Sequence, residues 1–239
     1  MKNRHRWRPT RFVRGRNGWR GSSDARDVAP ASRHIADLQA RSYAPALQTY
    51  ARGRLLDLGC GEVPLYEMYK DAVTAAVCVD WPRSYHDRTH LDVACDINQP
   101  LPFADNSFET VVLSDVLEHL HDHQTVWSEI ARVLRPSGHV IIGVPFLYWL
   151  HEEPYDYFRP TEFALRRFCE QNGLRVVLLA PFGGAIDVIF DIAAKHLGVV
   201  PVLARGFYWV GRALLPFGRR LLARTNRKFP LGYVLVAAR

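Results

Sequence analysis

The sequence predicts an α/β protein with a Rossmann-like, doubly wound sheet. The sheet is expected to be mostly parallel with an antiparallel last strand, and to carry helices on both faces. Short apolar segments of strand length alternate with segments of helical periodicity from about residue 31 onward. Gly59 and Gly61 directly follow the first apolar segment, where such folds turn sharply from their first strand into their first helix.

The expected elements follow one another along the chain. Apolar residues at helical spacing predict a leading helix or helix pair over 31–51. Pro64 suits a first helical turn, and Gly173 suits a helix stop. The stretch 185–229 departs from the alternation, and Pro216 argues against one long helix there, so two helical pieces are expected. The remaining helices are expected at 64–70, 124–134 and 161–172, and the strands at 54–58, 75–80, 90–96, 110–114, 139–144, 175–179 and 232–238.

The positive charge of the chain is concentrated at its two ends. The net charge is +7, and residues 1–20 and 192–239 contain many Lys and Arg but no Asp or Glu. Basic ends of this kind favour polyanions such as nucleic acid, anionic lipid headgroups or phosphorylated glycans. We expect residues 1–30 to be a basic flexible arm, and residues 31–239 to form one domain with a helical insert at about 185–229.

Cysteine usage and hydropathy bear on the compartment. The four cysteines form no C-x-x-C pair and no regular spacing, which favours reduced thiols and a cytoplasmic protein. The basic start is not followed by an apolar stretch, so no signal peptide is expected. The longest apolar runs fall well short of the roughly 20 residues of a spanning helix.

The residues around the glycine turn distinguish between two kinds of cofactor. A dinucleotide fingerprint would place a third glycine where Pro64 stands. Asp57, just before the turn, would repel a pyrophosphate but would favour the ammonium and sulfonium of S-adenosylmethionine. Asp80 ends the next strand and can bond ribose hydroxyls, while Asp96 can accept from an exocyclic amine.

Four segments in order make the resemblance specific. They read L-D-L-G-C-G at 56–61, L-P-F-x-D-x-S-F at 101–108, L-E-H at 117–119 and E-I-x-R-V-L-R-P-S-G at 129–138. Over about 50–180 and the last strand, the chain resembles the class I S-adenosylmethionine-dependent methyltransferases. The one departure from the family's first motif lies just after this segment, at Val63, where the family often has a glycine.

The resemblance implies the activity, the cofactor and a set of binding residues. The cofactor would be S-adenosyl-L-methionine, with its methionine end at the glycine turn, its ribose near the second strand end and its adenine near the third. Ser114 would lie near the sulfonium. The cofactor-binding residues implied are Asp57, Gly59, Cys60, Gly61, Asp80, Trp81, Asp96, Ile97 and Ser114.

The segment after the fifth expected strand is the candidate acceptor site. His151 has a suitable intrinsic pKa for a general base, and Glu152, Glu153 and Asp156 are alternatives. Another reading is that Asp156 pairs with Arg159 and that the aromatic residues close the core. The candidate substrate residues are His119, Tyr148, Trp149, Tyr157 and Arg159.

The sequence leaves several classes of methyl acceptor possible. H-E-E-P-x-D-Y-F-R-x-T at 151–161 resembles a branch associated with bacterial surface-polysaccharide and glycolipid synthesis. That favours O-methylation of a saccharide or lipid-linked glycan. The alternatives are a quinone-like or other small aromatic acceptor, and a non-catalytic cofactor-binding module that holds RNA. No recognisable RNA-binding module accompanies the basic N-terminus, which argues against nucleic acid.

Two further features complete the expectations. His119, His121 and His123 lie two residues apart, a spacing that does not share one helix face, so no metal site is expected. The insert at 185–229 combines large apolar residues with arginines, which suits the boundary of an anionic membrane at its inner, cytoplasmic face. The alternative is that its apolar face packs on the domain or on a second subunit.

Overall fold

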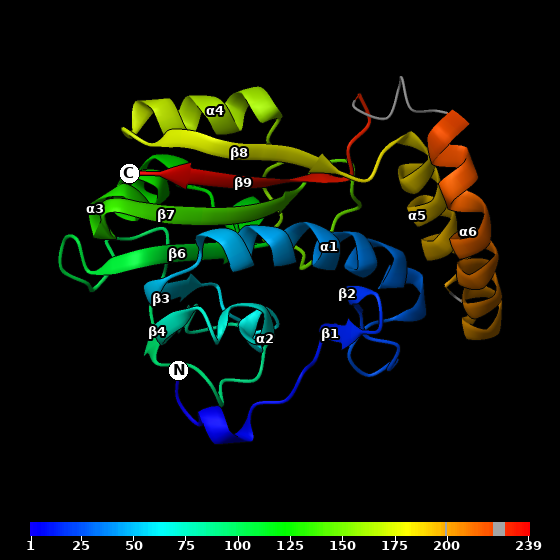
Figure 1. The fold of residues 1–239 in the computed structure, drawn as a ribbon, viewed down its shortest axis with the longest axis horizontal. Coiled ribbons are helices and arrows are strands. Elements are labelled where there is room, and N and C mark those ends of the chain that lie inside the picture. Colours follow the sequence, from blue (N-terminus) through cyan, green and yellow to red (C-terminus); the bar gives the residue numbers. More distant parts are fainter. Residues whose placement is uncertain (199, 222–227) are drawn as a thin grey trace.

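A seven-stranded mixed sheet forms the centre of the molecule (Figure 1). The computed structural model describes residues 1–198, 200–221 and 228–239, without the side chains at 201, 204, 205, 212 and 219. Five neighbouring strands run parallel, and the last strand of the chain runs antiparallel to both of its neighbours. The predicted fold class is therefore confirmed. Across the sheet the order is β5 (Val93–Ala94), β4 (Val73–Asp80), β3 (Gly53–Leu58), β6 (Phe108–Ser114), β7 (Leu134–Pro145), β9 (Gly232–Ala238) and β8 (Arg175–Phe182).

Helices cover both faces of the sheet, and each face has its own core. On one face lie α1 (Arg33–Tyr50) and α2 (Tyr66–Tyr69), and on the other α3 (His123–Val133) and α4 (Glu162–Gln171). Because side chains alternate along a strand, Leu55 packs in the first core and Leu56 in the second. All these strand residues are buried, as strands covered on both sides must be.

Helix α1 lies unusually close to the sheet at Gly143. A Cβ at that position would lie only 1.8 Å from the hydroxyl oxygen of Tyr43. Glycine is therefore required at Gly143, and Tyr43 reaches past it toward the carboxyl ends of β6 and β7. Its hydroxyl lies 3.3 Å from the Asp115 carboxylate, which follows β6 directly.

Several elements differ from the prediction at their ends. Strand β7 begins at Leu134, which pairs with Phe108 before a bulge, so the expected break at Pro136 and Gly138 lies inside the strand. Strand β5 has only two residues: before it, the Asp92 carboxylate accepts from the backbone N–H of Cys78 in β4, and after it Asp96 holds a turn through Asn98. The other predicted strands and helices agree with the structure to within a few residues.

Residues 1–30, expected as a flexible arm, are folded against the body. A 3-10 turn, η1 (Arg4–Arg6), precedes a hairpin of β1 (Phe12–Gly15) and β2 (Gly18–Gly21), and a second turn, η2 (Pro30–Ser32), leads into α1. Phe12 is 1% exposed and packs edge-on against Tyr43 of α1. Burial of such a ring is worth a few kcal/mol, which is why the segment is held in place.

The insert before the last strand forms two helices, as expected, but it divides elsewhere. Helix α5 (Ala185–Leu197) ends before Gly198 and helix α6 (Pro201–Leu221) begins at Pro201, while Pro216 lies inside α6. Gly211 lets α6 approach the Phe190 ring of α5 closely. In Figure 1 the pair stands at the end of the sheet toward which β8 points. Among the described residues, no helix is both long and apolar enough to cross a membrane.

Candidate active site

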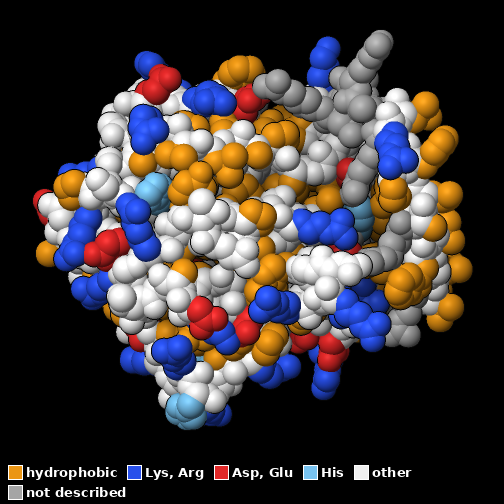
Figure 2. Space-filling view, viewed as in Figure 1, with side chains coloured by type: hydrophobic (Ala, Val, Ile, Leu, Met, Phe, Trp, Pro, Cys, Tyr) orange, Lys and Arg blue, Asp and Glu red, His pale blue; other side chains and the backbone are white. Residues whose placement is uncertain are grey.

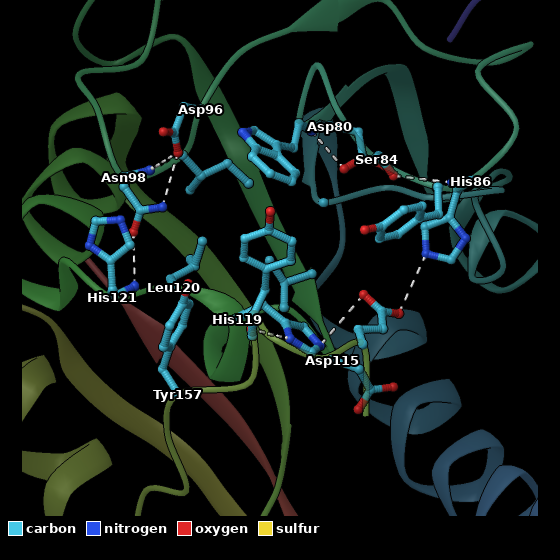
Figure 3. Close-up of a pocket in the computed structure, with 17 residues that line it drawn as sticks. Asp80, Ser84, His86, Asp96, Asn98, Asp115, His119, Leu120, His121 and Tyr157 are labelled. Atoms are coloured by element: carbon cyan, nitrogen blue, oxygen red, sulfur yellow. Dashed lines mark hydrogen bonds and ion pairs between the residues drawn. The ribbon is translucent and has the colours of Figure 1, made fainter. Parts of the chain in front are cut away.

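Two adjoining cavities lie at the carboxyl ends of β3, β4, β6 and β7. Their volumes are about 200 and 320 Å³. Four residues line both of them: Gly59, His86, Asp115 and Glu152. The first cavity is drawn in Figure 3. This is the place where open α/β sheets bind their ligands, since loops from neighbouring parallel strands meet there.

The first cavity begins at Asp80, the last residue of β4. One oxygen of its carboxylate accepts from the backbone N–H of Gly61 and from the hydroxyl of Ser84, both at 3.1 Å. The other accepts from the backbone N–H of Trp81 at 2.7 Å. These bonds fix the carboxylate at the cavity wall (Figure 3). Trp81, the next residue in the chain, also lines the cavity.

Asp96 and Ile97 line the far end of the same cavity. The Asp96 carboxylate accepts from the backbone N–H and the side-chain amide of Asn98, at 2.9 and 3.0 Å. The amide oxygen of Asn98 in turn accepts from the backbone N–H groups of His121 and Asp122. Asn98 therefore ties the loop after β5 to the loop after β6, and it gives the cavity a fixed width (Figure 3).

The charge of the first cavity selects its ligand. Asp80, Asp96, Asp115 and Glu152 line it, and none of the lining residues the structure describes is Lys or Arg. Carboxylates attract a cationic ligand and repel a phosphate. S-adenosylmethionine, which carries a sulfonium and an ammonium but no phosphate, fits this lining, whereas a dinucleotide does not.

The glycine turn supports the same choice through its backbone. Gly59 and Cys60 both donate their N–H groups to the carbonyl of Val79, and Gly61 donates to Asp80. In a phosphate-binding turn such amides point at the ligand, but here all three are occupied by protein acceptors. A Cβ on Gly59 would lie 2.4 Å from Val116, so the turn and the loop after β6 are in direct contact.

Val63, the departure from the family pattern, has an unusual backbone. Its φ is 54°, in the left-handed region that a β-branched residue rarely adopts, and its side chain is fully buried. The N–H of Val63 donates to Cys60, and its carbonyl accepts from the indole of Trp7. The valine thus keeps the conformation of a glycine, and the N-terminal arm contributes one of the contacts that hold it.

Asp57 lies behind the turn rather than in either cavity. It is 4% exposed, and the hydroxyl of Tyr69 donates to its carboxylate at 3.0 Å. Burial raises the pKa of Asp57 to about 7, although the bond from Tyr69 acts against that rise. The direct contact with the cofactor's ammonium that the sequence implies is therefore not open to this carboxylate as it lies here.

The second cavity joins the glycine turn to the candidate acceptor segment. Cys60, Gly61 and Ser114 line it on one side, and Tyr148 and His151 on the other. Helix α1 and the N-terminal arm close it with side chains that the sequence did not single out. These are Thr10, Arg11, Arg26, Asp27, Ile35 and Gln39.

Asp115 stands where the two cavities meet. The side-chain amide of Gln39 donates to both of its oxygens at 2.9 Å, and Arg11 lies 3.9 Å away. Burial raises the pKa of Asp115 to about 6, against the attraction of Arg11. The residue has a φ of 54°, which turns the chain sharply at the end of β6.

His151 is held by two carboxylates. Its Nδ1 lies 3.2 Å from Asp156, and its Nε2 lies 3.5 Å from Oε1 of Glu118. Burial alone would lower the pKa of His151, but Glu118 and Asp156 together raise it. Asp156 is almost fully buried and is clamped by the guanidinium of Arg159, so the predicted Asp156–Arg159 pair is present in the structure.

The other candidates for the base differ in position. Glu152 lines both cavities and lies between His86 and His119, at 3.7 and 3.9 Å. The imidazole of His86 lowers the pKa of Glu152, and Glu152 raises that of His86. Glu153 and Asp156 line neither cavity as the structure describes them.

The predicted acceptor residues are divided between the two cavities. Tyr148 lines the second, with its ring edge on His151, while His119 and Tyr157 line the first. Trp149 and Arg159 are outside both linings. Trp149 instead lies beside Tyr148 under the ammonium of Lys195, which connects the acceptor segment to α5.

Sequence reasoning missed two groups of lining residues. The loop after β4 supplies Ser84, Tyr85 and His86, and the loops after β5 and β6 supply Asn98, Asp115 and Glu118. Each follows an expected strand directly, which is a signal that could have found them. Arg11 and Gln39 gave no such signal, since they reach the site only through the packing of the N-terminal segment.

Comparison with known proteins shows which enzymes the chain resembles. Residues 56–142 match the family model described as a methyltransferase domain. The fold is shared with a solved S-adenosylmethionine-dependent methyltransferase from Archaeoglobus fulgidus, at 18% identity and a TM-score of 0.57, over 84% of this chain and 93% of that one. Residues 56–142 are thus similar to a methyltransferase domain, and they lie on a fold shared with solved S-adenosylmethionine-dependent methyltransferases.

Curated relatives narrow the comparison. The ubiquinone/menaquinone biosynthesis C-methyltransferase UbiE of Desulfotalea psychrophila is 33% identical over 139 residues, which are 57% of this chain and 46% of that protein. A demethylmenaquinone methyltransferase of Corynebacterium glutamicum is 35% identical over 95 residues, 38% of this chain and 40% of that protein. The matched part is thus less than half of each relative's length.

Fold likeness alone does not decide the reaction. The [4+2]-cyclase SpnF shares the fold at 16% identity and a TM-score of 0.56, over 86% of this chain and 81% of that one. Since one fold carries different reactions, the activity of this protein has to be argued from its own site.

Proposed function

We propose that this protein transfers the methyl group of S-adenosylmethionine to a small aromatic, quinone-like acceptor. The observation that carries the proposal is the junction of the two cavities. One side holds the carboxylates expected for ribose and adenine, and the other holds Tyr148 and His151 of the acceptor segment. A ligand extending through the junction passes Gly59, Asp115 and Glu152, which line both sides.

The protein's own residues divide the work as follows. Bound S-adenosylmethionine supplies a methyl group on a positively charged sulfur. Asp80 and Asp96 hold the nucleoside end, and Gly59 lets the ligand pass close to the backbone. Tyr148 offers a flat wall for the acceptor, since its ring is partly buried and held by His151 and Lys195. The rate gain comes mainly from holding the two reactants in line.

The acceptor must also lose a proton. Of the four bases predicted from the sequence, His151 and Glu152 reach the second cavity. Asp156 serves His151 from behind, and Glu153 is exposed. His151 lies beside Glu118. Whether these two side chains bind a proton or a metal ion decides how the acceptor is activated.

The relatives favour the aromatic acceptor over the saccharide. The acceptor segment at 151–161 suggested a glycan, but the relatives named above act on demethylmenaquinone or in quinone biosynthesis by their names. A quinone with an apolar tail also suits the surface beside the site. Helix α6 buries Gly211 and Leu215 against α5 and leaves Trp209, Leu214 and Phe217 exposed. Figure 2 shows hydrophobic side chains at the edge of the molecule where α6 lies.

That exposed apolar face is the basis of the membrane contact we propose. Trp209, Leu214 and Phe217 are 63%, 63% and 72% exposed, and the surrounding segment 192–239 has only basic charges. An anionic lipid surface fits both properties. Arg220 is exposed. The side chain of Arg219, and Arg224 as a whole, lie outside the described residues.

A panel of acceptors tests the function. Purified protein with methyl-labelled cofactor is incubated with a reduced naphthoquinone that lacks its ring methyl group, with a simple phenol, and with a lipid-linked glycan. We expect label in the reduced naphthoquinone, and mass spectrometry of the product identifies the methylated atom. Label only in the glycan would reject the aromatic acceptor. Tight NADH binding without binding of S-adenosylmethionine would reject the cofactor.

A further inference from the structure

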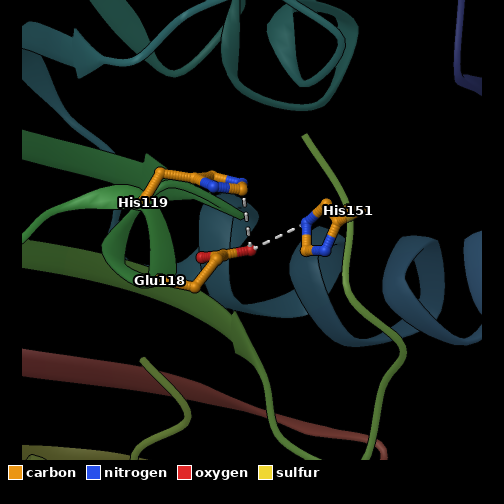
Figure 4. Close-up of side chains that lie close together, drawn as sticks. All are labelled: Glu118, His119 and His151. Carbon is orange, nitrogen blue, oxygen red and sulfur yellow. Dashed lines mark ion pairs between the residues drawn. The ribbon is translucent and has the colours of Figure 1, made fainter. Parts of the chain in front are cut away.

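Three side chains from two loops meet beneath the junction of the cavities (Figure 4). Glu118 and His119 lie in the 3-10 turn η3 (Leu117–His119) after β6, and His151 lies in the loop after β7. One ligand atom from each lies within 4.8 Å of the other two. Sequence reasoning weighed a metal at His119, His121 and His123, but the structure brings a different set together.

Glu118 has an environment that calls for a cation. Its side chain is fully buried, and neither carboxylate oxygen has a hydrogen-bond donor among the described residues. A buried, unbonded carboxylate is costly, by at least a few kcal/mol. The Nε2 atoms of His151 and His119 lie 3.5 and 3.8 Å from its Oε1.

These separations are too long for direct hydrogen bonds and slightly longer than those between ligands around one ion. Direct hydrogen bonds between nitrogen and oxygen lie near 2.9 Å. Two ligand atoms that each lie about 2.1 Å from a divalent ion are about 3 to 3.5 Å apart. The Glu118 oxygen and the two imidazole nitrogens need to move inward by only a few tenths of an ångström to meet that geometry.

Both imidazole rings are oriented from behind. Nδ1 of His119 lies 2.8 Å from the carbonyl of Tyr155, an acceptor that requires a proton on that nitrogen. Nδ1 of His151 faces the Asp156 carboxylate, which Arg159 clamps in turn. With the protons on Nδ1, each Nε2 presents a lone pair to the side where Glu118 lies. Ligating histidines are characteristically held in this way by carbonyl or carboxylate partners.

We propose that Glu118, His119 and His151 bind one divalent cation, with ions that accept imidazole ligands, such as Zn²⁺ or Co²⁺, favoured over Mg²⁺. Three protein ligands leave coordination positions open. Glu152 lies next to one of them, since its Oε2 is 3.9 Å from Nε2 of His119 and its other oxygen contacts His86. The open side faces the cavities, because His119 lines the first and Glu118 and His151 line the second.

The role of the cation in catalysis rests on the proposed function. An acceptor hydroxyl bound at an open position loses its proton to the Glu152 carboxylate. The oxygen, or the ring carbon that it activates, then forms a bond to the methyl carbon. When the ring carbon reacts, it afterwards loses its own hydrogen as a proton and the oxygen takes a proton back, which restores the aromatic ring. The bond from that carbon to sulfur breaks, and sulfur keeps the electron pair as a neutral thioether. A cation lowers the cost of the first step by stabilising the oxygen anion.

The first test is binding of the metal alone. Protein stripped with a chelator is titrated with Mn²⁺, Co²⁺, Zn²⁺ and Mg²⁺ by calorimetry, and Co²⁺ is also followed by its visible absorption bands. We expect one site per chain, with Zn²⁺ and Co²⁺ bound at least tenfold more tightly than Mg²⁺. Glu118→Gln and His151→Gln should each weaken binding at least tenfold. His121→Gln, two residues from His119 but outside the cluster, should leave affinity unchanged.

Thermal unfolding shows whether a variant has lost metal binding only because it no longer folds. Co²⁺ should raise the melting temperature of the parent protein and not that of Glu118→Gln, whose amide nearly preserves the buried shape. Absence of stoichiometric binding, or equal affinity in parent and Glu118→Gln, overturns the inference. Methyl transfer that survives complete removal of metal would leave the proposed function standing without a cation. Metal binding in a protein that methylates no aromatic acceptor would do the reverse.

Discussion

Replacing Asp57 with Asn should change how the stability of the protein depends on pH. The Asp57 carboxyl is 4% exposed, and its one side-chain partner among the described residues is the hydroxyl of Tyr69. Burial raises its pKa from an ordinary 3.8 to about 7. Because the folded state prefers the protonated carboxyl, the stability that this group provides is complete below about pH 4 and is lost as pH rises toward 7.

The magnitude follows from the two pKa values. Each pH unit between them corresponds to about 1.4 kcal/mol, so the loss between pH 5 and pH 8 is about 2–3 kcal/mol. Asn cannot ionise, and its side-chain oxygen can still accept from Tyr69. The free energy of unfolding of Asp57→Asn minus that of the parent should therefore be about 2–3 kcal/mol larger at pH 8 than at pH 5.

Urea unfolding followed by tryptophan fluorescence measures this difference at both pH values. Asp71→Asn, the same substitution at an exposed position, should follow the parent at every pH. If Asp57→Asn and the parent lose stability in parallel from pH 5 to pH 8, the carboxyl is already ionised in the folded protein. The glycine turn would then have a charged group behind it, as the sequence suggested.

Two further predictions concern the ligands. Asp80→Asn should weaken S-adenosylmethionine about ten- to a hundredfold in calorimetry, because an acceptor for two ribose hydroxyls is worth about 1–3 kcal/mol; equal affinity in Asp80→Asn and the parent would remove Asp80 from the cofactor site. Reversing Arg219, Arg220 and Arg224 to Glu should abolish co-sedimentation with anionic vesicles and leave cofactor affinity intact, since each basic residue near such a surface contributes about 1 kcal/mol. A parent protein that stays in the supernatant at low salt would show that the exposed face of α6 does not contact lipid.

The parts of the fold that sequence predicts best are those whose signal is local. Strand β9 was expected at 232–238 and lies there, because a continuous apolar run in a two-sided sheet has sharp ends. Helices α3 and α4 begin where Asp122 and Thr161 accept from backbone N–H groups three residues ahead. Strand β7 began earlier than expected, because pairing with β6 outweighed the turn signal of Pro136 and Gly138.

The N-terminal segment shows where composition misleads. Its many arginines suggested a solvated arm, yet Phe12 is buried and the segment closes the second cavity through Thr10 and Arg11. A local signal was present, since Asn17 and Gly18 are typical turn residues: Arg16-Asn17 forms the two-residue loop, and Gly18 follows it with a φ of 106°. No local sequence pattern predicts the face of α1 on which the hairpin packs.

Local sequence patterns also could not predict the metal site that we propose, although its three ligands are all present in the sequence. Glu118 and His119 are adjacent, but His151 follows 32 residues later, and the two loops meet only because β6 and β7 are parallel neighbours. The spacing of His119, His121 and His123 gave no reason to expect a metal. The Nδ1 partners, the Tyr155 carbonyl and Asp156, decide which nitrogen of each ring presents its lone pair to Glu118. When the proton of a histidine is fixed on the far nitrogen, the near nitrogen is free to bind a metal ion. The sequence singled out His151 as a general base, and its position beside Glu118 makes it a candidate metal ligand instead.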